Sequence, residues 1–568
     1  MAVARGAARA RAAPGHRRAH HRRRLALAPV VAVLALVVVL LLAAPARCNF
    51  TDRSSHALKR RGTRSACFVA QDRVREGIAR AMRVFPRLAD RRGPRQSGHM
   101  PPFELVQGRS HPDWPLVAEC ETDLAMPDWR AVLPNASAPA FGSEDSSRVY
   151  KSIRIPVASA EHWVDQWLLQ RFRRMEQTHH GARWRILDVP LYVNYRSTHK
   201  DCLALHTTDA PRRPRATWRG RIDALVRSLE ATPPDELKNL VVVMTGWQRK
   251  PYNGDRTGMR LLSLLVSLNA TLLTVDTKFA IRTSNHYVGA DEWKWKRTLI
   301  VPYVPHRTLG ARTDPPPALH QRTLIAYFRG KMKRRGEGRK RKSMLNLADL
   351  WTNAHLNSSI SDSHLNPQKI STTVSDGIDY VQGMLSSIFC LIPGGDTSTT
   401  RRLFDALAAG CIPIVIADFY GGKEGYLPTN RPGDRAMSRA MSANLPFTNL
   451  VDWARIAIFI DGLHCLEDGA VVTELACELG RLASEVAPAS MPNGRCDDGA
   501  RDDDGGGSSF LRNLSGEDIV AMQAAGSHAY RSVMQYGAGW PVGNKARYGP
   551  AAEAVLRELG DPPGGSPK

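Results

Sequence analysis

The stretch from Ser386 to Asp418 brings together glycines, hydroxyls and arginines of the kinds that bind an anion. An apolar run ends at Pro393, a turn rich in Gly, Ser and Thr follows over 394–400, and helical spacing begins at Arg401. Backbone N–H groups and hydroxyls at a helix N-terminus can hold phosphate, and arginine adds two-pronged contacts with it. The pattern therefore predicts a site for a diphosphate that needs no metal ion.

The predicted ligands of this site lie in the turn and at the start of the helix. Asp405 stands three residues after Arg402, so its carboxylate could accept hydrogen bonds from ribose hydroxyls. From the residues alone, an ordinary strand-to-helix turn with Ser/Thr capping and a solvated arginine pair is an equally good interpretation. The candidate ligands in this stretch are Gly395, Asp396, Ser398, Thr399, Arg402 and Asp405.

This stretch resembles the C-terminal signature of the exostosin-like glycosyltransferases, a family that includes heparan-chain and plant cell-wall transferases. The family pattern is S-x-F-C-L-x-P-x-G-D, then Ser/Thr residues, R-L-F-D/E-A and G-C-I-P-V-I, and this chain is similar to it throughout. Weaker similarity extends from Tyr150 to Tyr536. It includes the segments ILDVPLY (186–192), IVPYV (300–304), AYFRG (326–330) and LPFTNLVDW (445–453).

The resemblance implies a fold of the GT-B type, in which two Rossmann-like domains face a cleft and the C-terminal one holds the nucleotide. It also implies an inverting transfer from a nucleotide sugar, usually a UDP-sugar, in one in-line displacement. A general base then deprotonates the acceptor hydroxyl while positive groups stabilise the departing phosphate. Arg402 and Arg341 are predicted to supply that charge. No metal or other cofactor is expected beside the nucleotide sugar, which is a co-substrate.

The base is predicted among residues that precede the nucleotide-binding half. His286 and Asp291 are the catalytic candidates and Asp276 is a rival, while a structural role is the alternative for His286. Many relatives carry a Glu before the L-P-F motif and often another after it, where this chain has Asn444 and Thr448. If the first Glu contacts the donor, this departure affects sugar specificity or activity.

The elements that must position these residues are apolar strands that alternate with helices. Because fully apolar strands between helices form parallel sheets covered on both faces, the sequence predicts an α/β protein with two Rossmann-like domains. We expect an acceptor domain over 148–310, a nucleotide-sugar domain over 311–545 and a disordered tail over 546–568. The expected strands are 184–193, 240–245, 299–304, 323–328, 388–392, 412–417 and 456–460, and the clearest helices are 163–175, 401–409 and 519–536.

The N-terminus predicts a membrane anchor. Residues 1–24 carry many arginines and no acid, and residues 25–44 form an uncharged apolar run. A helix of this length spans about 30 Å, and the arginines would stay cytosolic by the positive-inside rule. We expect a type II Golgi membrane protein with a cytosolic tail (1–24), a signal anchor (25–44) and a partly disordered stem (45–147). A cleaved signal peptide is the alternative, although Pro45 makes a poor cleavage site.

The net charge of +25 would suit a nucleic-acid-binding protein, but its distribution argues against that class. Much of the excess lies in the N-terminal tail and in the run Arg329–Lys342. That run is either a solvated loop or a segment that contacts donor phosphate or an acidic glycan acceptor.

The cysteines and glycosylation sequons bear on the compartment. Nine cysteines form no C-x-x-C pair, so a zinc ribbon is not predicted and the disulfide pairing stays open. Cys390 and Cys411 are expected as apolar core residues. Five sequons give weak support to a lumenal chain. Their asparagines are Asn49, Asn135, Asn269, Asn357 and Asn513.

Two functions of different class remain open on the sequence. The first is a transferase that acts on a glycan or polysaccharide, with membrane attachment and a homo- or hetero-oligomer as further expectations. The second is an inactive exostosin-like relative that serves as partner or scaffold for another transferase. The donor sugar, the acceptor and the linkage are not determined by the sequence.

Overall fold

The computed structural model describes most of the C-terminal two thirds of the chain and shorter parts before it. All of these residues belong to one unit, 61–568. The described residues are 67–84, 101–106, 164–175, 184–188, 218–244, 256–277, 295–310, 312–330, 344, 347, 349–350, 358–362, 380–394, 399–420, 440–490, 510–538 and 547–560.

The N-terminal half forms a five-stranded sheet in which every neighbouring pair is parallel. Its strands alternate between two apolar cores, since Val241 and Val243 pack with α7 while Leu240 and Val242 pack with α9 and α11. The sheet order is β2 (Phe103–Val106), β3 (Trp184–Leu187), β4 (Leu240–Val243), β5 (Thr271–Thr274) and β6 (Arg297–Ile300). Its helices are α7 (Val164–Met175), α9 (Trp218–Ala231) and α11 (Arg256–Ser267).

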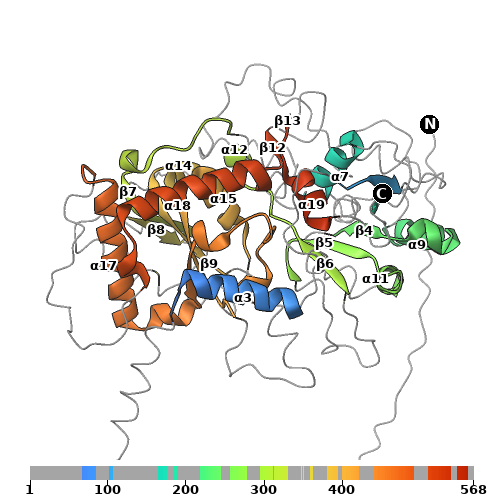
Figure 1. Ribbon diagram of the computed structural model, residues 1–568, viewed down its shortest axis with the longest axis horizontal. Helices are drawn as coiled ribbons and strands as arrows, with labels where there is room; N and C mark the ends of the chain where they lie inside the picture. Colours follow the sequence, from blue (N-terminus) through green and yellow to red (C-terminus); the bar gives the residue numbers. More distant parts are fainter. Residues whose placement is uncertain are drawn as a thin grey trace, which may run out of the picture. The chain divides into compact units, whose positions relative to one another are not determined.

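The C-terminal half forms a six-stranded sheet that is parallel except for the antiparallel edge strand β1. Figure 1 labels three of its strands, β7, β8 and β9. Residues of β10 alternate between the core on the side of α14 and α15 and the core on the side of α17. The order is β1 (Phe68–Val69), β11 (Ile458–Asp461), β10 (Ile412–Ala417), β9 (Ser387–Pro393), β7 (Leu324–Gly330) and β8 (Ser359–Asp362). The main helices are α14 (Tyr380–Leu385), α15 (Arg401–Ala409), α17 (Gly469–Val486) and α18 (Gly516–Ala529).

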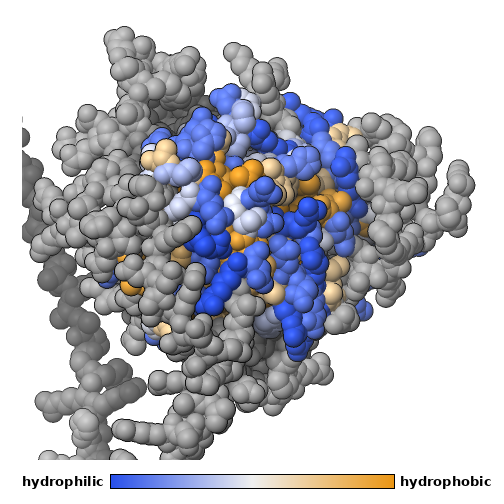
Figure 2. All heavy atoms as spheres, turned by 60° about the vertical axis from the view of Figure 1, so that its left-hand side comes forward, coloured by the Kyte–Doolittle hydropathy of each residue, from blue (hydrophilic) through white to orange (hydrophobic). Residues whose placement is uncertain are grey.

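Helix α17 shows why these helices form at the surface of the sheet. Leu475, Leu479 and Leu482 recur at helical spacing and are buried in the core, whereas Arg481 pairs on the outer side with Glu478 and Glu485. Figure 2 views the molecule from the side on which α17 lies in Figure 1. Among the coloured residues it shows mainly hydrophilic ones, with hydrophobic residues between them.

Part of the predicted stem (45–147) belongs to the two sheets. Its residues include β1, β2 and the helix α3 (Gln71–Val84). A disulfide joins Cys67, just before β1, to Cys465, and Arg75 of α3 pairs with Asp452 at 2.8 Å. These strands are too short for sequence periodicity to mark them. Helix α3, in contrast, buries Val74, Ile78 and Ala81 at helical spacing, a signal that the stem prediction overlooked.

The predicted tail (546–568) also contains structure. It includes β13 (Arg547–Tyr548), which pairs with β12 (Gly537–Ala538), and the helix α19 (Ala551–Leu559). Glu553 of α19 pairs with Arg171 of α7, and Trp184 Nε1 donates a hydrogen bond to the Gly560 carbonyl. The C-terminus therefore returns to the first sheet.

Shorter helical turns connect the main elements. They are α12 (Arg307–Gly310), the 3₁₀ turns Pro234–Leu237, Leu319–Gln321, Met441–Ala443, Trp453–Arg455, Leu463–Glu467 and Phe510–Asn513, and the π-helical turn Tyr530–Met534 that continues α18.

The expected α/β class with parallel sheets is confirmed, and the helix 401–409 is found with the predicted bounds and with Gly410 in the left-handed conformation (φ 64°) after it. The predicted helix 519–536 is instead α18 followed by the π-helical turn. No helix within the described residues is long and apolar enough to cross a membrane, and the predicted anchor, 25–44, lies outside them.

Candidate functional site

The candidate site lies where the C-terminal sheet reverses its strand order. The chain runs from β7 to β8 on one side, then returns through α14 to β9 on the other side of β7. Ligands of open parallel sheets bind outside the carboxyl ends of the strands at such a switch point. The predicted anion-binding turn directly follows β9, so the topology places it at this point.

Helix α15 begins at this turn. Leu403, Phe404 and Leu407 bury its apolar face, while the side chain of Thr400 at the N-cap makes no capping hydrogen bond. Its first N–H groups are therefore not satisfied by Thr400, and the positive end of the helix dipole lies at the switch point. Thr399 is buried beside it. The other predicted turn ligands, Gly395, Asp396 and Ser398, lie outside the described residues.

The two arginines of α15 have different partners. Arg401 Nε donates to Asp405 Oδ2 at 3.1 Å, one helical turn further on. Arg402 lies over the Phe328 ring of β7, with 5.3 Å between Cζ and the ring centroid, and it pairs with no carboxylate of the described residues. Of the two charges, Arg402 is therefore the one left for an anionic ligand.

Asp405 is fully buried and receives three donors, two of them from other segments of the chain. Tyr380 Oη donates to Oδ2 at 2.6 Å, the backbone N–H of His306 donates to Oδ1, and Arg401 is the third donor. Burial, followed by the Asp405 charge, raises the pKa of Tyr380 well above its ordinary value, so this phenol stays a donor. The predicted ribose contact of Asp405 would have to compete with these three bonds.

Neither His306 nor Tyr380 was predicted from the sequence as part of the site. His306 lies in the connection between the two sheets and its ring lies 5.8 Å from that of Tyr380. No motif marks either residue, because only tertiary contacts with Asp405 give them this position.

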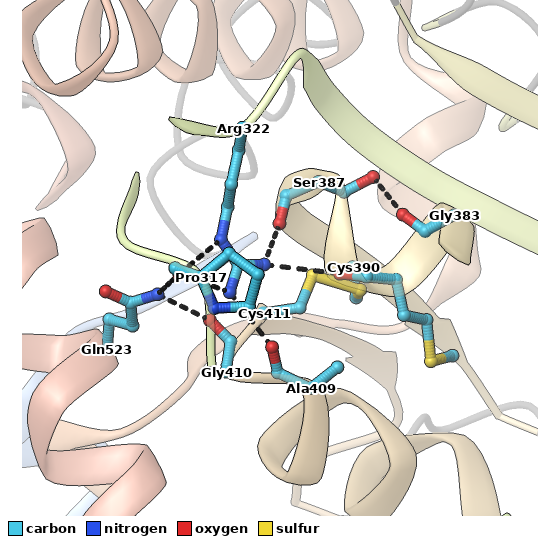
Figure 3. Close-up of a disulfide and its surroundings, with 10 residues drawn as sticks. Pro317, Arg322, Gly383, Ser387, Cys390, Ala409, Gly410, Cys411 and Gln523 are labelled. Carbon is cyan, nitrogen blue, oxygen red and sulfur yellow. Dashed lines mark hydrogen bonds between the residues drawn. A yellow bond between two sulfur atoms is a disulfide. The ribbon is translucent and has the colours of Figure 1, made fainter. Parts of the chain in front are cut away.

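The far end of α15 is fixed by a buried arginine (Figure 3). Arg322 donates to the carbonyls of Pro317, Met384, Ser387 and Ala409. Met384 and Ala409 belong to the last turns of α14 and α15, where a cation complements the helix dipole. Burial lowers the pKa of Arg322 to about 9, so the guanidinium is still charged at neutral pH.

A disulfide between Cys390 and Cys411 closes the same region, also drawn in Figure 3. Both residues are buried, but the expectation that they are simple apolar core residues was incomplete, because parallel pairing of β9 with β10 brings their sulfurs together. The bond encloses the turn and α15 within one loop. Cys477 is disulfide-bonded as well.

Asn444, which stands where many relatives have Glu, connects the two halves. Its Oδ1 accepts from the N–H of Thr277 at 2.7 Å and from Thr277 Oγ1 at 3.0 Å, and its Nδ2 donates to Ala440 O at 2.7 Å. Thr277 and its neighbour Asp276 are buried just after β5. The Asn444 side chain is thus engaged within the protein on both its carbonyl and its amide side.

The L-P-F motif after Asn444 carries backbone strain. Phe447 is fully buried and has φ 50°, a region that bulky residues rarely adopt. The N–H groups of Leu450 and Val451 bond to its carbonyl, and Trp453 Nε1 donates to Pro446 O at 2.8 Å. These contacts fix the loop that presents Asn444 to Thr277.

The remaining predicted residues divide into two groups. The candidate base residues His286 and Asp291, the predicted phosphate ligand Arg341 and the asparagines 49, 135 and 357 lie outside the described residues. Asn269 lies in the turn before β5 at φ 53°, and Asn513 is exposed at the end of a 3₁₀ turn. No cluster of three or more metal-ligating side chains occurs among the residues that the structure describes.

Comparisons with known proteins agree with the sequence signature. Residues 258–475 match the model of the Exostosin GT47 domain. A "Probable arabinosyltransferase" of Arabidopsis thaliana is 30% identical over 94 residues, 16% of each chain. A "Probable glucuronosyltransferase" of Physcomitrium patens is 25% identical over 197 residues, 34% of each chain. A "Probable xyloglucan galactosyltransferase" of Arabidopsis thaliana is 49% identical over 43 residues, 8% of this chain and 10% of its own.

The aligned parts span between a tenth and a third of these relatives' lengths. The family match includes the turn after β9, α15 and the L-P-F motif. It therefore covers the signature and the segments 300–304, 326–330 and 445–453, but not the segment 186–192. The resemblance to the exostosin-like glycosyltransferases is confirmed. Residues 258–475 of this chain are therefore similar to the exostosin-like GT47 glycosyltransferases.

Proposed function

We propose that this protein transfers a sugar from a UDP-sugar to a glycan or polysaccharide acceptor, with inversion at the anomeric carbon. The supporting observation is the position of Arg402. Its guanidinium lies at the switch point of the C-terminal sheet, next to the start of α15, and pairs with no acid of the described residues. A buried or half-buried cation of this kind is favourable when an anion completes its contacts.

The reaction needs one displacement. The acceptor oxygen forms a bond to the anomeric carbon while the bond from that carbon to the β-phosphate oxygen breaks, and a base takes the hydroxyl proton. UDP leaves with additional negative charge, which Arg402, the first N–H groups of α15 and Arg341 would stabilise. His286 and Asp291 remain the proposed bases. On this proposal the protein's own cations suffice and no metal is required.

The proposed setting is the Golgi lumen, with the protein held by a signal anchor at 25–44 as a type II membrane protein. Three disulfides involve described cysteines, which suits an oxidising compartment. The two-domain GT-B arrangement, with a cleft between the halves, is part of the same proposal. The parallel sheets support it.

Donor binding and hydrolysis test the proposal. The purified full chain is titrated with UDP- and GDP-sugars that include the arabinosyl, glucuronosyl and galactosyl donors named for the relatives. We expect one UDP-sugar to bind and to be hydrolysed slowly. Arg402→Ala should weaken binding by about 2 kcal/mol or more, roughly thirtyfold.

Arg260→Ala is the matched control, because Arg260 also lies on a helix but pairs with Glu230 on the exposed surface of the first half. It should leave donor binding unchanged. Equal losses in both variants, or full binding by Arg402→Ala, would remove Arg402 from the site.

An inactive partner or scaffold is the second candidate. The observation that favours it is Asn444, whose amide is engaged by Thr277 and Ala440 where many relatives carry Glu. A folded chain that binds UDP but hydrolyses and transfers no sugar, until a second transferase is added, would support this role.

A further inference from the structure

Strand β7 ends at Gly330, which has no side chain. The row of side chains on one face of the strand therefore stops at Phe328. Successive strand residues point to opposite faces, so Phe328 and Gly330 share a face. A Cβ at Gly330 would lie 2.8 Å from Arg402 Nη2 and 2.7 Å from Phe328 Cζ. Real Cβ contacts essentially never fall below 3.0 Å. The guanidinium of Arg402 can lie here because residue 330 is glycine.

The aromatic ring of Phe328 supplies the second wall. Phe328 is buried, so its ring is fixed, and the Arg402 guanidinium lies over it at 5.3 Å. The Nε of Arg402 is buried without a hydrogen-bond partner in the described part of the chain. Among the described residues, no acid pairs with Arg402 and no acceptor holds its Nε. Its place is determined by the ring and by the space at Gly330.

We infer that Phe328 and Gly330 are positioning residues that aim Arg402 at the donor diphosphate. The inference rests on the proposed function, since it takes Arg402 as the diphosphate contact. A methyl group at residue 330 displaces the guanidinium, and a displacement of about 1 Å can cost up to a hundredfold in a precisely oriented site. This positioning is a physical role for Phe328 and Gly330 of the motif A-Y-F-R-G (326–330).

The test compares glycine-to-alanine changes in the full chain, with UDP and uridine as probes. Gly330→Ala should weaken UDP binding roughly tenfold to a hundredfold and leave uridine binding unchanged, because only the phosphate contact is disturbed. Gly469→Ala is the matched control, since a Cβ there meets nothing within 4 Å. Phe328→Leu, which keeps an apolar side chain, should weaken UDP binding roughly threefold to tenfold.

A double-mutant cycle separates the possible outcomes. If Gly330 acts through Arg402, then Gly330→Ala adds little to the loss in an Arg402→Ala background. Full additivity, equal losses of UDP and uridine, or a Gly330→Ala protein that behaves like Gly469→Ala would overturn the inference. If Arg402→Ala itself binds UDP normally, the proposed function fails instead. Should Gly330→Ala not fold, the UDP-to-uridine ratio of Phe328→Leu decides.

Discussion

Asp405 accepts hydrogen bonds from segments that lie far apart in the sequence, among them His306 on the connection between the sheets and Tyr380 on α14. Because the carboxylate is fully buried, removal of an acceptor leaves these donors without partners or water. At the scale of the residue, this environment makes Asp405 a determinant of stability as well as a neighbour of the predicted diphosphate site.

We predict that Asp405→Asn lowers the free energy of unfolding by about 2–4 kcal/mol, because the new amide N–H₂ group faces a donor. Chemical denaturation of the full chain measures this loss. Tyr380→Phe should cost less in the Asp405→Asn variant than in the unmodified chain, since the Tyr380 hydroxyl has already lost its carboxylate acceptor. An unchanged unfolding free energy, together with weaker UDP binding, would favour the ribose contact instead.

Helices α14 and α15 both end beside the guanidinium of Arg322, which donates to Met384 O at 3.2 Å and to Ala409 O at 2.9 Å. The charge needs no carboxylate here, because the carbonyls at two helix ends carry partial negative charge. Gln523 adds hydrogen bonds to Pro317 and Gly410 at the same place (Figure 3). At the scale of the element, these contacts anchor the end of α15 that is opposite the anion site.

We predict that Arg322→Met lowers the free energy of unfolding by about 3–5 kcal/mol, because several buried carbonyls lose a charged donor. Arg322→Lys should recover only part of this loss, since one ammonium cannot reach the positions that the planar guanidinium joins. Thermal or denaturant unfolding of the two variants provides the measurement. Equal stability of Arg322→Lys and the unmodified chain would contradict the two-helix role.

At the scale of the whole molecule, the segment that follows α18 is hydrogen-bonded to the connection from β6 to β7. Tyr536 Oη donates to Pro302 O at 2.6 Å, and Gln535 Nε2 donates to Gly310 O at 3.1 Å. Burial raises the pKa of Tyr536 and of Tyr530 far above the ordinary 10.0. Their ionisation in the unfolded chain is therefore coupled to unfolding.

We predict that the contribution of Tyr530 and Tyr536 to the free energy of unfolding is constant below pH 10 and decreases above pH 10. The unfolded chain releases the phenol protons near pH 10 while the folded chain retains them, so a rise in pH favours unfolding. Tyr536→Phe and Tyr530→Phe should each reduce the slope of unfolding free energy against pH in this range.

The same two variants should differ at neutral pH. Tyr536→Phe removes a hydrogen bond and should cost about 1 kcal/mol. Tyr530→Phe should be nearly neutral, because the Tyr530 hydroxyl has no hydrogen-bond partner in the described part of the chain. Denaturation midpoints from pH 8 to alkaline conditions compare them. If neither variant changed the slope of unfolding free energy against pH, other groups would control the loss of stability at alkaline pH.

The sequence by itself determined the resemblance to the exostosin-like glycosyltransferases, the α/β class and the bounds of α15 with Gly410 after it. These depend on local order along the chain: apolar runs of strand length, helical spacing, and a glycine that can adopt positive φ. The signature around Pro393 is likewise a short contiguous motif, and the match over residues 258–475 includes it. Local physics and a specific motif therefore suffice for these features.

Only the tertiary structure decided which arginine pairs with an acid of the protein and which is left to bind a ligand. Arg401 and Arg402 are adjacent and chemically identical, yet one pairs with Asp405 and the other lies over Phe328. The Cys390–Cys411 bond and the pairing of β1 with β11 likewise join residues through sheet register. Such contacts form between segments that are distant in sequence. Their partners are set by packing, which local residue patterns do not encode.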